Sequence, residues 1–252
     1  MGFRSNGGGM MRHGWVNMGL VIAGGIGQRM GYAIPKQFMA IQGKPLLIHT
    51  LERLEYHPRI HGIQVVCLPD WMDRAAAMIR YHGIDKCVGL EPGGESGMAS
   101  IVIGVRALAE KVEDPAMTAV VIHVANRPIL PADILDLALD SCHQHGSGVC
   151  ALPVVEDPVH TADGITAAYA MDRKQIRRMQ TPQVFRLTDL LDAYDEAERR
   201  GITDAVSCAS LMLTLGRPVY LTPGTEKNLK VTTPDDVDIF RALLQMEQEG
   251  TP

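Results

Sequence analysis

Glycines and cations gather near the start of the chain. Gly24, Gly25 and Gly27 follow a short apolar run. Because glycine has no side chain, successive backbone N–H groups in such a turn can approach an anion. Arg29 lies two residues further on, and Lys36 follows seven residues later. A glycine turn with two fixed positive charges just beyond it predicts a binding site for a triphosphate.

This glycine turn differs from two familiar phosphate-binding motifs. A P-loop needs Gly-Lys-Ser/Thr at the start of its helix, whereas this chain has Gln28-Arg29-Met30. A dinucleotide fingerprint needs a third glycine where Met30 stands and an acidic residue at the end of the second strand. A nicotinamide cofactor is therefore disfavoured. For the glycines alone, an ordinary turn in an α/β protein remains the alternative.

Strand-like and helix-like segments alternate after the glycine turn. Apolar, β-branched runs predict strands at 19–23, 63–68, 86–90, 118–125 and 148–154. Apolar residues at helical spacing predict helices at 45–56, 98–108 and 131–144. This order is typical of a doubly wound, mostly parallel, Rossmann-like α/β sheet, with the 118–125 strand at its centre. Ligands bind outside the carboxyl ends of such strands, so we expect the turns at Gly24, Gly93 and Ala125 to meet in one crevice.

The alternation stops between about residues 156 and 183. Asp163-Gly164 is a hairpin signal between two extended segments. Two strands cannot bury a core by themselves, so we expect a β-arm that packs on a second copy and forms a homodimer. Beyond it we expect helices at 187–199 and 204–215, strands at 219–222 and 229–232, and a last helix that begins after Thr233.

Composition limits the protein classes and partners. The chain has 252 residues, 46% of them hydrophobic, and a net charge of −5. This charge offers no bulk attraction for nucleic acid or an anionic membrane, and no run is long enough to span a bilayer. The five cysteines lack paired spacing, so we expect free thiols and a cytoplasmic protein. We also expect residues 1–17 to be a flexible leader and residues 18–252 to form a single domain.

An ordered set of motifs runs from the glycine turn to the last helix. Its members are residues 23–31, Pro35-Lys36-Gln37-Phe38, His123, Arg127-Pro128, Met171-Asp172-Arg173, residues 180–185 and residues 228–236. Together they resemble the cytidylyltransferases that make CDP-polyols from 2-C-methyl-D-erythritol 4-phosphate or D-ribitol 5-phosphate. The resemblance implies a nucleotidyltransferase (GT-A-like) fold with a protruding arm and a role in isoprenoid or in CDP-ribitol (teichoic acid) biosynthesis. The opening motif mildly favours the ribitol branch.

The resemblance also implies a role for each matching residue. Arg29, Lys36 and Lys230 would be catalytic and would surround the α-phosphate of CTP, and Mg²⁺ would accompany the nucleotide. The implied nucleotide-binding residues are Ala23, Gly24, Gly25, Gly27, Gly94, Glu95, Ser100 and Arg127. The acceptor-binding residues would be Arg173, Thr181 and Asp157, with the acceptor's phosphate presented across the dimer.

Three positions depart from the family pattern. Val124 stands where the family has an aspartate, Gly97 stands where an arginine is usual, and a threonine is missing next to Asp157. Valine cannot ligate a cation, so the metal ligands remain unassigned. Two interpretations stay open: an active transferase with an altered substrate choice, or a catalytically impaired nucleotide-binding homologue with a regulatory or partner role.

Overall fold

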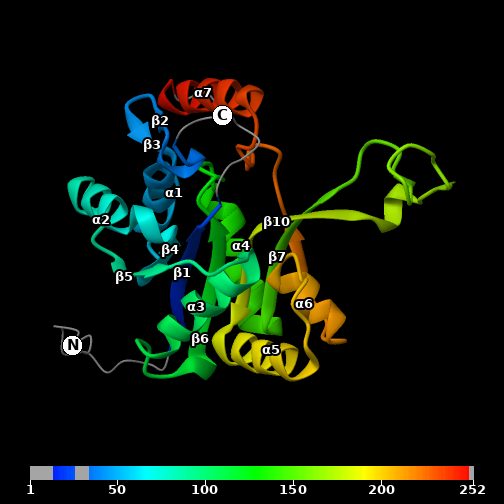
Figure 1. Ribbon diagram of the computed structural model, residues 1–252, viewed down its shortest axis with the longest axis horizontal. Coiled ribbons are helices and arrows are strands. Elements are labelled where there is room, and N and C mark those ends of the chain that lie inside the picture. Colours follow the sequence, from blue (N-terminus) through cyan, green and yellow to red (C-terminus); the bar gives the residue numbers. More distant parts are fainter. Residues whose placement is uncertain (1–13, 26–33, 250–252) are drawn as a thin grey trace.

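The computed structural model describes residues 14–25 and 34–249, which form a sheet covered on both faces by helices (Figure 1). The seven strands lie in the order β11-β7-β10-β6-β1-β4-β5. Their bounds are β1 Val16–Ala23, β4 Gly62–Cys67, β5 Cys87–Pro92, β6 Thr118–Val124, β7 Ser147–Pro153, β10 Arg177–Arg186 and β11 Leu221–Pro223. Every strand except β10 runs in the same direction. The predicted mostly parallel sheet with β6 at its centre is confirmed.

The two central strands bring their carboxyl ends to one edge of the sheet. Both are almost continuously apolar and buried, as expected of parallel strands covered on two faces. Their register pairs Ile22 of β1 with Val124 of β6, and Ala23 with Cys67 of β4. The segments that leave these strands therefore begin side by side.

Helices form a layer on each face of the sheet. Neighbouring residues of β1 face opposite layers: Val21 belongs to one buried cluster and Leu20 to the other. The Val21 face packs against α1 Leu46–Glu55, α2 Met72–Tyr81 and α4 Ala132–His145. The Leu20 face packs against α3 Gly97–Ala109, α5 Leu187–Arg200 and α6 Cys208–Thr214. The doubly wound arrangement is thus confirmed.

A third, smaller cluster forms under the last helix, α7 Pro234–Gln248. Thr233 caps this helix through a capping box with Asp236, as the sequence predicts. The helix packs its Phe240 with Val231 and Leu46, beside a small hairpin of β2 Ala40–Ile41 and β3 Lys44–Pro45. Short 3₁₀ helices complete the fold at η2 Lys36–Phe38, η3 Pro69–Trp71, η4 Pro115–Met117 and η5 Arg173–Gln175.

The predicted arm at 156–183 is too long. Residues from Arg177 onward form β10, which pairs antiparallel with both β6 and β7 inside the main sheet. Gln180 and Gln183 are buried there, so this part of the chain belongs to the core. The sequence does not predict this strand, because polar residues and Pro182 interrupt its apolar pattern.

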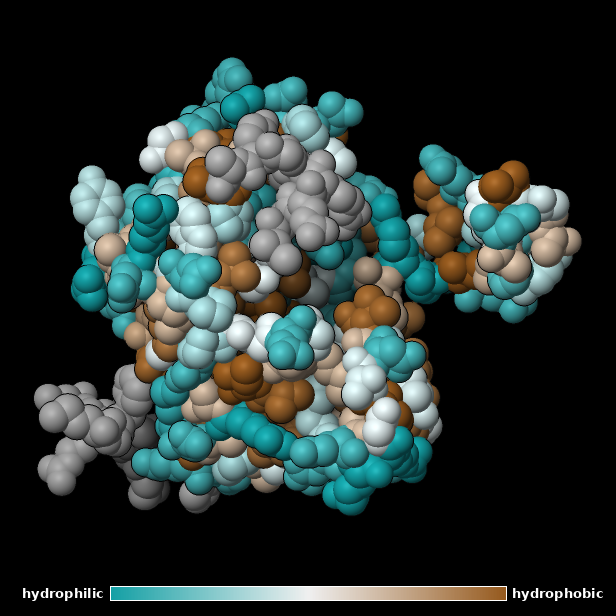
Figure 2. Space-filling model, viewed as in Figure 1, coloured by the Kyte–Doolittle hydropathy of each residue, from teal (hydrophilic) through white to brown (hydrophobic). Residues whose placement is uncertain are grey.

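The remaining arm projects from the body between β7 and β10 (Figure 1). Only β8 Val159–His160 and β9 Tyr169–Ala170 pair, so the hairpin is shorter and its loop wider than the Asp163-Gly164 signal suggests. Asp163 Oδ1 organises the loop by accepting hydrogen bonds from the backbone N–H groups of Ile165 and Thr166, each at 2.8 Å. The arm exposes apolar side chains (Figure 2). Ile165 is among the exposed residues.

Two further expectations need correction. The predicted strand at 229–232 does not form, because this segment makes a single backbone bond to Asn126 instead of a ladder. The predicted leader at 1–17 is too long, since β1 begins at Val16 and Trp15 stacks on His143 with ring centroids 4.5 Å apart. Residues 1–13 of that leader lie outside the described residues. Among the described helices, none combines the length and apolarity that a membrane crossing needs.

Candidate functional site

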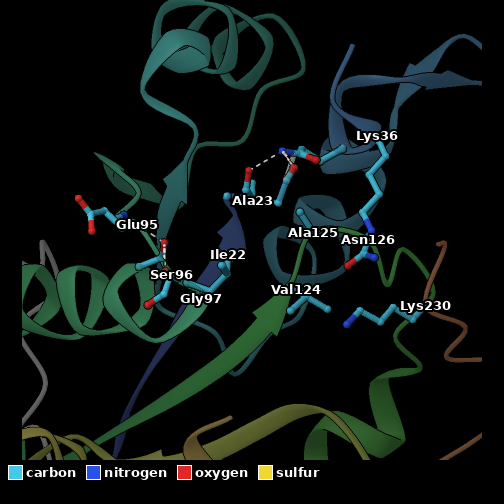
Figure 3. Close-up of a pocket in the computed structure, with 15 residues that line it drawn as sticks. Ile22, Ala23, Lys36, Glu95, Ser96, Gly97, Val124, Ala125, Asn126 and Lys230 are labelled. Carbon is cyan, nitrogen blue, oxygen red and sulfur yellow. Dashed lines mark hydrogen bonds between the residues drawn. The ribbon is translucent and has the colours of Figure 1, made fainter. Parts of the chain in front are cut away.

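A cleft of about 400 Å³ opens at the carboxyl ends of β1 and β6 (Figure 3). Its volume lies in the range of small-molecule sites. The predicted crevice is therefore present, and segments far apart in the chain line it. The residues from these segments are Ile22 to Gly25, Lys36, Gln37, Gly94 to Gly97, Ser100, Val124 to Asn126 and Lys230.

Gln37 ties the glycine turn to the segment that carries Lys36. Its side chain is 2% exposed, and its Nε2 donates hydrogen bonds to the carbonyl oxygens of Ala23 at 2.6 Å and Gly25 at 3.0 Å. Because Gln37 and Lys36 belong to the same 3₁₀ helix, these bonds also place Lys36 at the cleft. Two residues predicted for the same turn, Gly27 and Arg29, lie outside the described residues.

The second glycine turn is packed too closely for side chains. The backbone N–H of Gly93 donates to the Cys67 carbonyl at 2.7 Å, which closes the turn onto the end of β4. A Cβ on Gly93 would lie 3.1 Å from Ser100 Oγ, and a Cβ on Gly94 would lie 2.6 Å from the Cβ of Ala99. A side chain at Gly94 would therefore force Ala99 to move, whereas at Gly93 the space is merely tight.

Ser100 holds this turn against α3. Its Oγ accepts a hydrogen bond from the Gly94 N–H at 3.1 Å and donates one to the Ser96 carbonyl at 2.9 Å. Ser96 in turn caps α3 through a bond from the Ala99 N–H. Gly94, Glu95 and Ser100 consequently all line the cleft, as predicted.

The third turn holds the segment that carries Lys230. The Asn126 carbonyl accepts a hydrogen bond from the Val231 N–H at 2.8 Å, and Asn126 Nδ2 donates to the Val231 carbonyl at 2.9 Å. Lys230 thereby reaches the cleft that Lys36 also lines, and Figure 3 shows both lysines on the side opposite Glu95 and Ser96. The role of Asn126 could not be predicted from the sequence, because its hydrogen bonds to Val231 form only in the tertiary structure.

Arg127, which is predicted to bind the nucleotide, lies outside the described lining of the cleft. Its guanidinium is largely buried and donates to the carbonyl oxygen of Asn228. Burial, with a smaller contribution from Arg178, lowers the pKa of Arg127 to about 10. Arg127 therefore supports the loop before Lys230.

His123 is a neutral, buried partner of the same turn. The side chain is fully buried, and Nε2 lies 2.9 Å from the Arg127 carbonyl, to which it donates. Burial lowers the pKa of His123 to about 4, so the imidazole carries no charge near neutral pH.

The predicted acceptor-binding residues do not join the cleft within one chain. Arg173 lies on the arm, where its guanidinium donates to the Val155 carbonyl at 2.8 Å and lies 3.7 Å from Asp157 Oδ1. Thr181 lies in β10, and its carbonyl accepts a hydrogen bond from Asn228 Nδ2 at 2.7 Å. Within one chain, neither Arg173 nor Asp157 belongs to the described lining of the cleft.

The cleft has few ligands for a metal ion. Val124 lies in its floor with an apolar side chain, and Glu95 is the one acidic residue in the lining of described residues. Within residues 14–25 and 34–249, no group of three or more His, Cys, Asp or Glu side chains is arranged to hold a metal ion. The described side chains therefore do not fit a protein-built cage for a divalent cation.

All five cysteines are free, and burial raises the pKa of Cys67 to about 11.

A doubly wound sheet with glycine turns and two lysines at the carboxyl ends of its strands defines a nucleotide-binding α/β protein. Residues 18–246 match the family 2-C-methyl-D-erythritol 4-phosphate cytidylyltransferase (IspD), and the chain belongs to this family of nucleotidyltransferases.

Known proteins similar to the chain include cytidylyltransferases with two different acceptors. It is 38% identical to a ribitol-5-phosphate cytidylyltransferase of Lacticaseibacillus paracasei, over 91% of this chain and 98% of that protein. It is 35% identical to a 2-C-methyl-D-erythritol 4-phosphate cytidylyltransferase of Syntrophus aciditrophicus, over 91% and 96%. The crystal structure of the Francisella tularensis enzyme of the second type superposes with a TM-score of 0.75 and 27% identity, over 90% of this chain and 99% of that chain. Enzymes of this family generally depend on a divalent cation.

Proposed function

We propose that this chain transfers CMP from CTP to a polyol phosphate and releases pyrophosphate. One observation carries the proposal: Lys36 and Lys230, 194 positions apart in the sequence, line one cleft whose walls are glycine turns. In the reaction an oxygen of the acceptor's phosphate attacks the α-phosphorus of CTP. The bond from that phosphorus to the bridging oxygen breaks, and pyrophosphate leaves with the electron pair.

The residues present suit this chemistry because phosphoryl-type transfer needs positioning and charge stabilisation more than covalent help. We assign Lys36 and Lys230, together with Arg29, to the developing negative charge on the α-phosphate. The backbone of Ala23, Gly24, Gly25 and Gly27 would receive the phosphates.

The opposite wall suits the nucleoside. Gly94 and Ser100 are rigid parts of the cleft, since the Ser100 hydroxyl bonds both the Gly94 N–H and the Ser96 carbonyl. We place the cytosine or ribose of CTP against this wall, next to Glu95. Gly97 gives the nucleoside additional room, because a Cβ at this position would meet no atom of the described residues within 4 Å.

Mg²⁺ is the cation we propose, bound together with CTP. It commonly takes one or two carboxylates and completes its shell with phosphate oxygens and water. Since Val124 provides no ligand, the phosphates would supply most of the oxygens, and water would complete the shell. The cation would neutralise charge on the leaving pyrophosphate.

The acceptor is best assigned to the ribitol 5-phosphate branch. The opening glycine motif favours it, and relatives that bear this name reach 38% identity, against 35% for the relative named for methylerythritol phosphate. The difference is small, so both acceptors belong in the first assay.

The exposed apolar surface of the arm supports the proposal of a homodimer. Ile165 is 90% exposed there, and Val155 and Tyr169 also present apolar surface that one chain leaves uncovered. Packing of the arm on a second copy would bury this surface and would bring Arg173 of one protomer towards the cleft of the other, whereas Thr181 stays in the main sheet of its own chain. We place the protein in the cytoplasm, because its cysteines are free and the substrates are phosphorylated metabolites.

The alternative is a nucleotide-binding homologue that does not turn over, and Val124 is the observation that favours it. Pyrophosphate release separates the two functions when it is measured with CTP, Mg²⁺ and each polyol phosphate in turn. Release that requires one acceptor supports the transferase. CTP binding by calorimetry without release with either acceptor would instead establish the non-catalytic protein.

A further inference from the structure

We propose that Asn126 is a positioning residue that sets where the Lys230 ammonium group lies. The inference rests on the proposed function, because it assigns Asn126 a task only if Lys230 takes part in transfer. The underlying observation is independent of that function. Asn126 holds the residue next to Lys230 by two hydrogen bonds, one from its backbone and one from its side chain.

The loop of residues 224–231, which carries Lys230, has little regular structure of its own. All of its residues are described by the structure, and they form neither strand nor helix between β11 and α7, so other segments must hold this loop. Arg178 holds its early part through an ion pair with Glu226 at 2.6 Å, and Gln180 donates to the Thr225 carbonyl at 3.1 Å. Closer to Lys230, the Asn228 carbonyl accepts a hydrogen bond from the Arg127 guanidinium, and Asn228 Nδ2 donates to the Thr181 carbonyl at 2.7 Å. All of these contacts lie before Lys230 and leave the backbone just after it to be fixed by something nearer.

Asn126 supplies that nearer contact. Its carbonyl accepts from the Val231 N–H at 2.8 Å and its Nδ2 donates to the Val231 carbonyl at 2.9 Å, so both polar groups of Val231 are bound to one residue. The Val231 side chain is buried in the cluster under α7, which prevents it from turning. Because both the backbone and the side chain of Val231 are held, the direction in which the Lys230 side chain leaves the loop is fixed as well.

Asn126 also lines the cleft itself and is only 6% exposed. Figure 3 shows it between Lys36 and Lys230, above Val124. It leaves β6 by way of Val124 and Ala125, and the Ala125 N–H donates to the Ile22 carbonyl at 3.0 Å. The turn at Ala125 and Asn126 thus connects the end of β6 to the loop that carries Lys230, so the position of Lys230 depends on the central strands.

Loss of the side-chain bond should matter more for rate than for folding. The backbone bond between Asn126 and Val231 survives any substitution, so the loop stays in place but loses one of two constraints. A misplacement of about 1 Å at a reacting centre can cost on the order of 10²-fold in rate. We expect Asn126→Leu, which keeps the size but removes the donor, to lower kcat by roughly 10- to 100-fold.

A double-mutant cycle between Asn126 and Lys230 tests the inference. kcat for pyrophosphate release is measured for the full-length wild type, Asn126→Leu, Lys230→Ala and the double variant. If Asn126 acts through Lys230, its substitution costs about twofold or less once Lys230 is gone. The KM for CTP should change by less than about threefold in Asn126→Leu while kcat falls. Equal losses in both backgrounds, or an unchanged kcat in Asn126→Leu, would overturn the inference.

Two controls keep the outcome clear. Asn17→Leu removes two side-chain bonds at the amino end of β1, away from the cleft: Asn17 Nδ2 donates to the Arg59 carbonyl at 3.0 Å, and Asn17 Oδ1 accepts from His143 Nε2 at 2.8 Å. It should lower the melting temperature and leave kcat unchanged. If Asn126→Leu does not fold, Asn126→Ala carries the same test. A fully active Lys230→Ala would refute the proposed site, whereas an impaired Lys230→Ala with a normal Asn126→Leu would refute only the role of Asn126.

Discussion

Substitution of Gln37 gives a sharp test of how the glycine turn is held. Its amide donates to two carbonyls of unequal exposure: Ala23 is buried, whereas Gly25 is exposed. In Gln37→Leu the Gly25 carbonyl can turn to water, so the main cost is one unpaired buried carbonyl, about 1–3 kcal/mol of unfolding free energy. In Gln37→Glu an ionised carboxylate would face both carbonyls, which costs more and raises the pKa of the new carboxyl group.

The sign of the pH effect follows from that raised pKa. In its protonated form the new carboxyl group can donate one hydrogen bond, so Gln37→Glu should be most stable in acid and should lose stability as the pH rises through about 5–7. Urea unfolding of both variants at several pH values measures this.

The same variants should bind CTP more weakly, because Gln37 fixes the start of the phosphate-binding turn. Gln64→Leu is the matched control: Gln64 is fully buried in β4 and donates to the Val65 carbonyl at 3.1 Å. It should lose stability without losing affinity for CTP. If Gln37→Leu kept both wild-type stability and wild-type affinity, the turn would be held in some other way and the reasoning would fail.

Three further predictions concern pH, the metal and the arm. Because burial lowers the pKa of His123 to about 4, folding stability should decrease as the pH falls from about 6.5 towards 4, with a slope of up to ~1.4 kcal/mol per pH unit; His123→Asn should flatten this slope, and an unchanged slope would exclude His123 as its source. Val124→Asp should lower the Mg²⁺ concentration for half-maximal pyrophosphate release, because a carboxylate adds a ligand that Mg²⁺ prefers; an unaltered Mg²⁺ dependence would show that the floor of the cleft does not meet the cation. Ile165→Asp should shift sedimentation equilibrium from dimer towards monomer, while Val206→Asp, at a position 94% exposed outside the arm, should not; a dimer that survives Ile165→Asp at micromolar concentration would count against the arm as the interface.

The parts of the fold that depend on local signals could be predicted from the sequence. β6 was predictable because seven residues from Thr118 to Val124 form an apolar, strand-like run. The start of α7 was predictable because Thr233, Pro234 and Asp236 make a capping box whose bonds are all local. The order of strands and helices then placed three turns at one edge of the sheet.

The features that depend on contacts between distant segments could not be predicted. β10 carries buried glutamines and a proline, and it becomes a central strand only because β6 and β7 leave a space between them. The segment 229–232 has the composition of a strand but finds one backbone partner, Asn126, and so stays irregular. Arg127 matches a motif associated with the nucleotide, yet the structure turns it towards Asn228.

The most direct test of the account compares wild type with Lys36→Ala in pyrophosphate release from CTP, with Mg²⁺ and ribitol 5-phosphate. Lys44→Ala is the control, since Lys44 pairs with Glu52 at 2.7 Å outside the cleft lining. We expect Lys36→Ala to fold normally and to lose on the order of 10²–10³-fold in kcat, while Lys44→Ala retains the wild-type rate. A folded Lys36→Ala with wild-type turnover would contradict the central claim that this cleft is where CMP is transferred.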